Sequence, residues 1–119
     1  MRLNEVNYSD GAPIDGYGPG FFRVGGQVVT GGLLVAPGLT PAVWGGYDDA
    51  APLLALSGSV DVLLVGTGAE IAHIPADLRA ALEEIGIGVE IMASPAACRT
   101  YNVLLSEGRR IGLAARPVA

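Results

Sequence analysis

Lysine is absent from this chain of 119 residues, and cysteine, histidine and tryptophan each occur once. Without lysine, the protein cannot form a Schiff base with a substrate or hold phosphates through a P-loop lysine. The single cysteine, Cys98, cannot form an internal disulfide, which is compatible with a reducing compartment. One histidine and one cysteine among scattered carboxylates match no zinc or iron ligand spacing, so we expect no metal and no other cofactor.

Charge is also scarce, at 16% of residues, and the net charge is −5. An acidic balance argues against nucleic acids and anionic membranes as partners. Residues 24–47 carry no charge, but seven glycines together with Pro37 and Pro41 would interrupt a spanning helix. The first ten residues lack the basic-then-apolar pattern of a signal peptide. We expect a cytoplasmic protein without a membrane span.

Half of the residues are hydrophobic, which is typical of a globular protein. A chain of this length can bury roughly 65% of its unfolded surface, enough for a core without disulfides or metals. No linker or internal repeat interrupts the sequence. We therefore expect one domain over residues 1–119, as a monomer or a weak dimer.

A strand, a helix and a second strand are predicted in the middle of the chain. The apolar run Val60 to Val65 is typical of a strand buried on both faces, and the turn Gly66 to Gly68 closes it. Apolar residues then recur at helical spacing between Pro75 and Ile85. A further strand follows at Val89 to Met92. The helix between them predicts a parallel pair of strands with a right-handed crossover.

A second helix follows directly, with Ser94 as its predicted N-cap and Gly108 as its C-terminal exit. The last predicted strand is Ile111 to Ala115. Both helices begin where a parallel strand ends, so their N-termini should open on the same edge of the sheet. In open α/β sheets that edge is the usual place for a ligand.

The first half of the chain is rich in short strands and glycine turns, so the fold class is α/β with a β-rich N-terminal half followed by β-α-β-α-β. Gly25-Gly26 between two apolar runs predicts a hairpin. The expected elements are an edge strand at Leu3 to Tyr8, a loop at Ser9 to Gly20, hairpin strands at Phe21 to Val24 and Gln27 to Thr30, strands at Leu33 to Ala36 and Val43-Trp44, and a short helix at Ala51 to Leu56 capped by Asp48 or Asp49.

A candidate ligand or anion site lies at the shared edge of the sheet and comprises Gly66, Thr67, Gly68, Cys98, Arg99 and Asn102. Arg99, near two helix N-termini, could bind a carboxylate or a phosphate. The alternative is structural, with Arg99 and Asn102 tying down neighbouring loops.

Cys98 lies in the first turns of its helix beside an arginine, and both features lower the pKa of a thiol. A nucleophilic cysteine would also need a base, for which His73 is the one histidine. The simpler interpretation is that Cys98 is a small buried hydrophobe and His73 a solvated loop residue. No complete catalytic set is present, so we expect no enzymatic activity, with a cysteine-dependent enzyme as the alternative.

Trp44 and Tyr47 flank two glycines. They form either an exposed aromatic surface for a protein partner or a cover over the end of the core. The sequence leaves both interpretations open.

Several motifs resemble one small domain family in order and spacing: Tyr17 to Gly20 with Phe22 to Val24, Leu63 to Gly68, Gly86 to Glu90, and above all Ala96 to Leu105 with Glu107 to Arg110. This is the family of unknown function that includes the mitochondrial respiratory complex I assembly factor 3 proteins. The resemblance covers nearly the whole chain.

The resemblance implies a three-layer (β+α/β/α) architecture with a mixed central sheet. It also implies a non-catalytic protein-interaction or complex-assembly role, with respiratory complex subunits or another assembly factor as partners. No catalytic residue or cofactor is transferred by it, and the chain looks like a bacterial cytosolic member. The alternative function is a small-anion or metabolite-binding protein that uses the edge near Gly66–Gly68 and Arg99.

Overall fold

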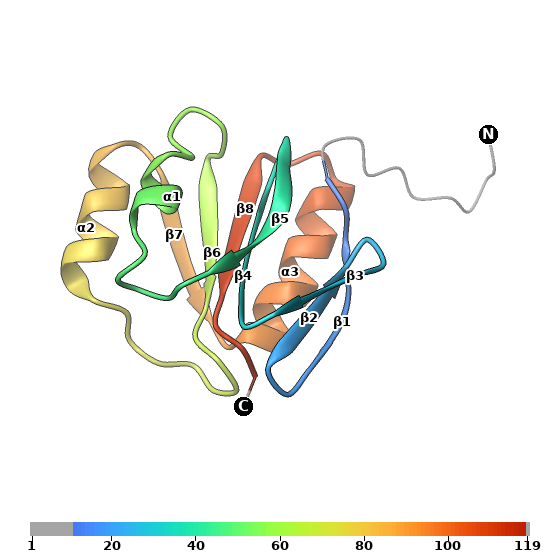
Figure 1. Cartoon of the computed structure of the whole chain (residues 1–119). Helices are drawn as coiled ribbons and strands as arrows, with labels where there is room; N and C mark the ends of the chain where they lie inside the picture. Colours follow the sequence, from blue (N-terminus) through green and yellow to red (C-terminus); the bar gives the residue numbers. More distant parts are fainter. Residues whose placement is uncertain (1–10, 119) are drawn as a thin grey trace.

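The structure, a computed structural model, describes residues 11–118 of the chain. A five-stranded sheet forms the middle of three layers (Figure 1). Helices α1 (Ala51–Leu54) and α2 (Ala76–Glu84) cover one face of it, while α3 (Ser94–Ser106) and a three-stranded sheet cover the other. The three-layer α/β architecture is therefore confirmed. The strand predicted at Leu3 to Tyr8 lies outside the described residues.

The middle sheet is mixed. Its order is β5 (Leu39–Trp44), β4 (Gly32–Ala36), β8 (Ile111–Ala115), β6 (Val62–Gly66) and β7 (Gly88–Met92). Strand β6 is parallel to both β7 and β8, whereas β4 is antiparallel to β8 and β5. Every residue of β4 and β8 is buried, because these strands are covered on both faces.

The two long helices lie on opposite faces of this sheet. From β6 the chain moves outward to β7 through α2, and from β7 it moves back past β6 to β8 through α3. Two right-handed crossovers that step in opposite directions must place their helices on opposite faces. Side chains of β6 alternate accordingly, with Leu64 in the core under α3 and Leu63 and Val65 in the core under α2.

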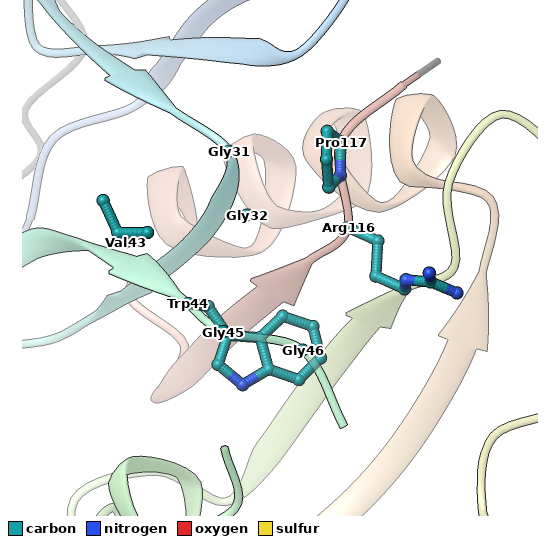
Figure 2. Close-up of a pocket in the computed structure, with 8 residues that line it drawn as sticks. All are labelled: Gly31, Gly32, Val43, Trp44, Gly45, Gly46, Arg116 and Pro117. Atoms are coloured by element: carbon teal, nitrogen blue, oxygen red, sulfur yellow. The ribbon is translucent and has the colours of Figure 1, made fainter. Parts of the chain in front are cut away.

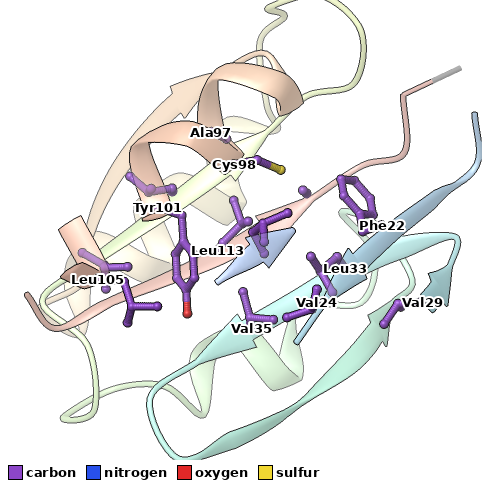
Figure 3. Packing of buried hydrophobic residues seen from close by; sticks show 14 residues of the cluster. Phe22, Val24, Val29, Leu33, Val35, Ala97, Cys98, Tyr101, Leu105 and Leu113 are labelled. Carbon is purple, nitrogen blue, oxygen red and sulfur yellow. The ribbon is translucent and has the colours of Figure 1, made fainter. Parts of the chain in front are cut away.

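The core under α3 is closed by the small antiparallel sheet of β1 (Ile14–Gly18), β2 (Phe21–Val24) and β3 (Gln27–Thr30). Figure 3 shows side chains of α3 and of β2 facing one another across this core. The predicted hairpin is confirmed, because β2 pairs with β3 around Gly25 and Gly26, both at positive φ.

Helices α1 and α2 close the second core, which includes Trp44, Leu53, Leu63 and Leu82. Helix α2 ends at Glu84, and Gly86 just beyond its C-cap residue Ile85 has a φ of 89°, the left-handed conformation typical of a helix exit. Within residues 11–118 no helix is long and apolar enough to cross a bilayer.

Both predicted N-cap residues are wrong. Ala93 is the N-cap residue of α3, and the Ser94 hydroxyl is used elsewhere. Ala50 is the N-cap residue of α1, and the Asp49 carboxylate instead accepts a hydrogen bond from Gly45 N at 2.9 Å. In each case a tertiary partner takes the side chain that the local pattern assigned to the helix.

The loop predicted at Ser9 to Gly20 is also partly wrong, because β1 occupies Ile14–Gly18 and pairs with β2. Strand β5 begins at Leu39, earlier than the predicted Val43. Helix α1 ends at Leu54, two residues before the predicted end.

Candidate functional site

The parallel strands β6, β7 and β8 end at one edge of the middle sheet, where Ser94 links the turn after β6 to the residues after β8. Its side chain is fully buried. The Ser94 hydroxyl accepts a hydrogen bond from Gly68 N at 2.9 Å and donates one to Arg116 O at 2.6 Å. Two backbone hydrogen bonds, from Ser94 N to Gly68 O and from Arg116 N to Gly66 O, join the same three segments.

The glycines of the candidate ligand turn have a structural role at this edge. A Cβ atom on Gly66 would lie 2.7 Å from the Ser94 hydroxyl and 3.0 Å from Ser94 Cα. Gly68 has a φ of 107°, which favours glycine. The Thr67 hydroxyl donates to Glu70 O at 2.7 Å. The turn therefore packs closely against the start of α3.

Cys98 points into the core under α3 and is 4% exposed (Figure 3). Burial raises the pKa of its thiol to about 11, although the positive charge of Arg99 acts in the opposite direction. At neutral pH the thiol is protonated and shielded from solvent, which disfavours a nucleophilic role.

The structure does not bring His73 to Cys98. His73 is exposed and lines a hollow with Ile91, whose side chain packs on the α2 side of the sheet. Cys98 belongs to the core on the α3 side. The two candidate partners are therefore separated by the middle sheet.

Asn102 ties α3 to the small sheet. Its Oδ1 accepts a hydrogen bond from Ile14 N at 2.8 Å, and its Nδ2 donates one to Ile14 O, also at 2.8 Å. These two hydrogen bonds agree with the structural alternative, in which Asn102 holds a neighbouring segment in place. Arg99 is exposed on the same helix. Binding of an anion by Arg99 and the turn stays a prediction.

Trp44 covers the end of the second core, while Tyr47 is half-buried beside it. The Trp44 indole is 2% exposed, and its Nε1 donates a hydrogen bond to Asp49 O at 3.1 Å. The two rings meet edge to face, with centroids 5.8 Å apart. The guanidinium of Arg116 lies 5.1 Å from the centre of the Tyr47 ring, at a cation–π distance.

A hollow of about 320 Å³ opens between the end of β5 and the residues that follow β8 (Figure 2). Four of its lining residues are glycines, which leave room beside the Trp44 ring, and Arg116 is the charged one among them. The lining comprises Gly31, Gly32, Val43, Trp44, Gly45, Gly46, Arg116 and Pro117.

Sequence reasoning found Trp44 and Tyr47 but missed the contributions of Ser94 and Arg116 to this edge. The local pattern assigned Ser94 to the N-cap of its helix and gave Arg116 no role, because both residues act on segments distant in sequence. Within residues 11–118, no group of three histidine, cysteine, aspartate or glutamate side chains is arranged to hold a metal ion.

The chain belongs to a family of proteins of unknown function, DUF498/DUF598, whose model matches residues 14–115. The matched range begins with β1 and ends with β8, so it spans all the described strands and helices. The family resemblance drawn from the sequence motifs is confirmed.

Two relatives and one solved structure place the chain within that family. An uncharacterized protein of Rhodobacter capsulatus is 52% identical, over 99% of this chain and 94% of that protein. A Danio rerio protein named NADH dehydrogenase (ubiquinone) 1 alpha subcomplex assembly factor 3 is 34% identical, over 98% of this chain and 71% of that protein. The crystal structure described as an outer membrane protein from Bartonella henselae has a TM-score of 0.84 at 33% identity, covering 95% of this chain and 100% of that one.

Proposed function

We propose that the protein is a non-catalytic factor that binds other proteins and assists the assembly of a complex such as a respiratory NADH dehydrogenase. The observation that carries this proposal is the similarity to the Danio rerio assembly factor over almost the whole of this chain. A cytoplasmic location is part of the proposal and is compatible with a single cysteine, which cannot form an internal disulfide.

The use of the most specific motif, Ala96 to Arg110, supports a role without catalysis. Its apolar residues Ala97, Cys98, Tyr101 and Leu105 are buried in the core under α3. Its amide Asn102 hydrogen-bonds the backbone of β1. The motif thus specifies how α3 packs. These buried residues are closed to a partner, so the groups that bind partners lie among the exposed residues of the surface.

The proposal is tested by deleting the gene in the source organism and measuring assembled NADH dehydrogenase on native gels. We expect less of the full complex and more of its partial assemblies. Expression of the wild-type chain should restore assembly, and so should a Cys98→Ala variant, because no catalytic thiol is required. Normal assembly in the deletion strain would contradict the proposal, and restoration by wild type but not by a folded Cys98→Ala variant would indicate chemistry at the thiol.

A further inference from the structure

Strand β7 is an edge strand of the middle sheet, so its open edge is the side of the sheet along β7 and not the end where the parallel strands finish. It is the last strand in the order, and within residues 11–118 β6 is its single strand neighbour. Gly88 N donates to Asp61 O, and Met92 O accepts from Thr67 N, so the backbone of these residues faces β6. Backbone groups alternate in direction along a strand, which turns those of Val89 and Ile91 outward. Among the described residues, none forms a hydrogen bond with these outward groups.

An apolar hollow of about 340 Å³ lies beside this edge on the α2 side of the sheet. It is lined by Ile71, Ala72, His73 and Ile91. Ile71 is 67% exposed, although its loop is held in place: the Thr67 hydroxyl donates to Glu70 O and accepts from Ala72 N at 3.1 Å. These hydrogen bonds fix the loop in a conformation that leaves the large apolar side chain of Ile71 exposed.

The side of the molecule around β7 is acidic. Residues 67–92 contain five carboxylates and one arginine, Arg79, which pairs with Glu83 at 3.4 Å. Glu90 is exposed at the centre of β7, and exposed Glu70 directly precedes Ile71. Positively charged segments are therefore favoured at this edge.

We propose that the β7 edge, defined by residues 88–92 and Ile71, binds a partner protein through an extended segment in which apolar and basic residues alternate. A strand added to β7 would turn every second side chain toward the hollow and the others toward the face that carries Glu90. The first set meets Ile71 and Ile91, so it is apolar. The second set meets Glu90, so it is basic. This inference rests on the proposed function, since it names the surface through which that function acts.

A second copy of the chain does not suit this edge. Two β7 strands paired around their centres would place Glu90 opposite Glu90, and like charges directly opposite each other destabilise a strand pair. A charged residue at the centre of an edge strand is also a common protection against self-association. The proposal therefore assigns the alternating basic segment to a different protein.

The first test uses a short blocked peptide in which valine and arginine alternate, titrated into the isotopically labelled full chain and followed by NMR. We expect the amide signals of Val89 and Ile91 to shift, and binding to weaken as salt is raised. A peptide with glutamate in place of arginine should bind about tenfold more weakly. Only every second residue of the peptide directs its backbone N–H toward β7. N-methylation of those residues should abolish binding, whereas N-methylation of the residues between them should leave most of the binding intact.

Two pairs of matched variants locate the surface. Glu90→Arg should weaken binding of the arginine peptide about tenfold, while Glu107→Arg, the same charge change at the end of α3, should leave it unchanged. Ile71→Ser should weaken binding, and Val103→Ser, at another exposed apolar position on α3, should not. All four residues are exposed, so the amide spectrum of each variant should show the intact fold.

Failure of this inference is distinct from failure of the proposed function. Absent shifts, shifts confined to other strands, or equal binding of the arginine and glutamate peptides would each overturn the β7 inference. If deletion of the gene nevertheless impairs assembly of NADH dehydrogenase, and the Glu90→Arg variant restores it fully, the assembly role stands and its surface lies elsewhere. Normal assembly in the deletion strain, together with specific peptide binding at β7, would remove the NADH dehydrogenase role and keep the strand-binding site.

Discussion

At Gly66 the space that a side chain would need is filled by the start of α3. The nearest obstacles to a Cβ atom are the hydroxyl and Cα of Ser94 and the side chain of Ala115. The Ser94 hydroxyl is fixed by two hydrogen bonds, so it has little freedom to move aside. Close packing against α3 therefore explains why residue 66 is a glycine.

Replacing Gly66 by alanine should lower the free energy of unfolding by about 1–3 kcal/mol, as overpacking of a tight site does. Urea unfolding measures the change. Gly16→Ala is the matched control, because nothing lies within 4 Å of its Cβ position, and it should have little effect. Equal stability of Gly66→Ala and the wild type would show that α3 can shift freely at this edge.

Stability should fall at alkaline pH because of two buried acids. Burial raises the pKa of Cys98 from 9.0 to about 11 and that of Tyr101 from 10.0 to about 12. The unfolded chain therefore releases these protons first, so stability is complete below pH 9 and is lost as the pH rises from 9 to 11 for the thiol, and from 10 to 12 for the phenol. Each group contributes a slope of at most about 1.4 kcal/mol per pH unit.

Unfolding free energies of the wild type and of Cys98→Ala, measured between about pH 7 and pH 10, test this expectation. The variant should lack most of the fall between about pH 9 and 10, and the absence of lysine keeps other titrations in this range few. The same alkaline slope in both proteins would show that the thiol is not the group responsible.

At the scale of elements, β1 shows where the sequence alone was insufficient. Its residues Ile14 to Gly18 include an aspartate and two glycines, which are typical of a loop. The strand forms because β2 pairs with it and because Asn102 of α3 hydrogen-bonds both backbone groups of Ile14. Both partners are supplied by tertiary structure.

Asn102→Ala should loosen β1 while the middle sheet stays intact. Loss of both hydrogen bonds leaves Ile14 N and O without their partner, at a cost of about 1–3 kcal/mol. Hydrogen exchange should accelerate at Ile14 more than at Leu113 in the centre of β8. Ser106→Ala, which removes an exposed hydroxyl on the same helix, is the control. Equal acceleration at both amides would mean that β1 and the middle sheet open together.

The elements with clear periodicity or turn chemistry were predicted well. The bounds of β8 agree with the predicted Ile111 to Ala115, and the hairpin around Gly25-Gly26 has the predicted strands. The parallel pairing of β6 and β7 is also confirmed. The candidate-site residues were predicted less well as a group, because Ser94 and Arg116 depend on contacts between distant segments.

At the scale of the whole molecule, the opposed directions of the two crossovers determine what can meet at the sheet edge. Both long helices do start at this edge, as predicted, but they start on opposite faces of the sheet. A histidine ahead of α2 and a cysteine within α3 are therefore kept apart. Sequence spacing predicted that both helices start at the same end of the sheet, whereas the separation of His73 from Cys98 depends on the strand order.

The two cores should unfold in a single transition. Neighbouring residues of β6 belong to different cores, so neither core can lose its packing while that strand stays in place. Fluorescence of Trp44 reports on one core, and exposure of the Cys98 thiol to a labelling reagent reports on the other. Their urea midpoints should coincide in the wild type. Separate midpoints would show that one layer detaches first.

The position of β8 has a consequence for synthesis on the ribosome. It is the last strand in the described chain, yet it lies between β4 and β6 in the sheet. While β8 is still in the exit tunnel, the nascent strands β4 and β6 each lack the neighbour that β8 provides, and their apolar edges are exposed. The middle layer can close only after β8 emerges, so the nascent chain depends on protection of these strands until then.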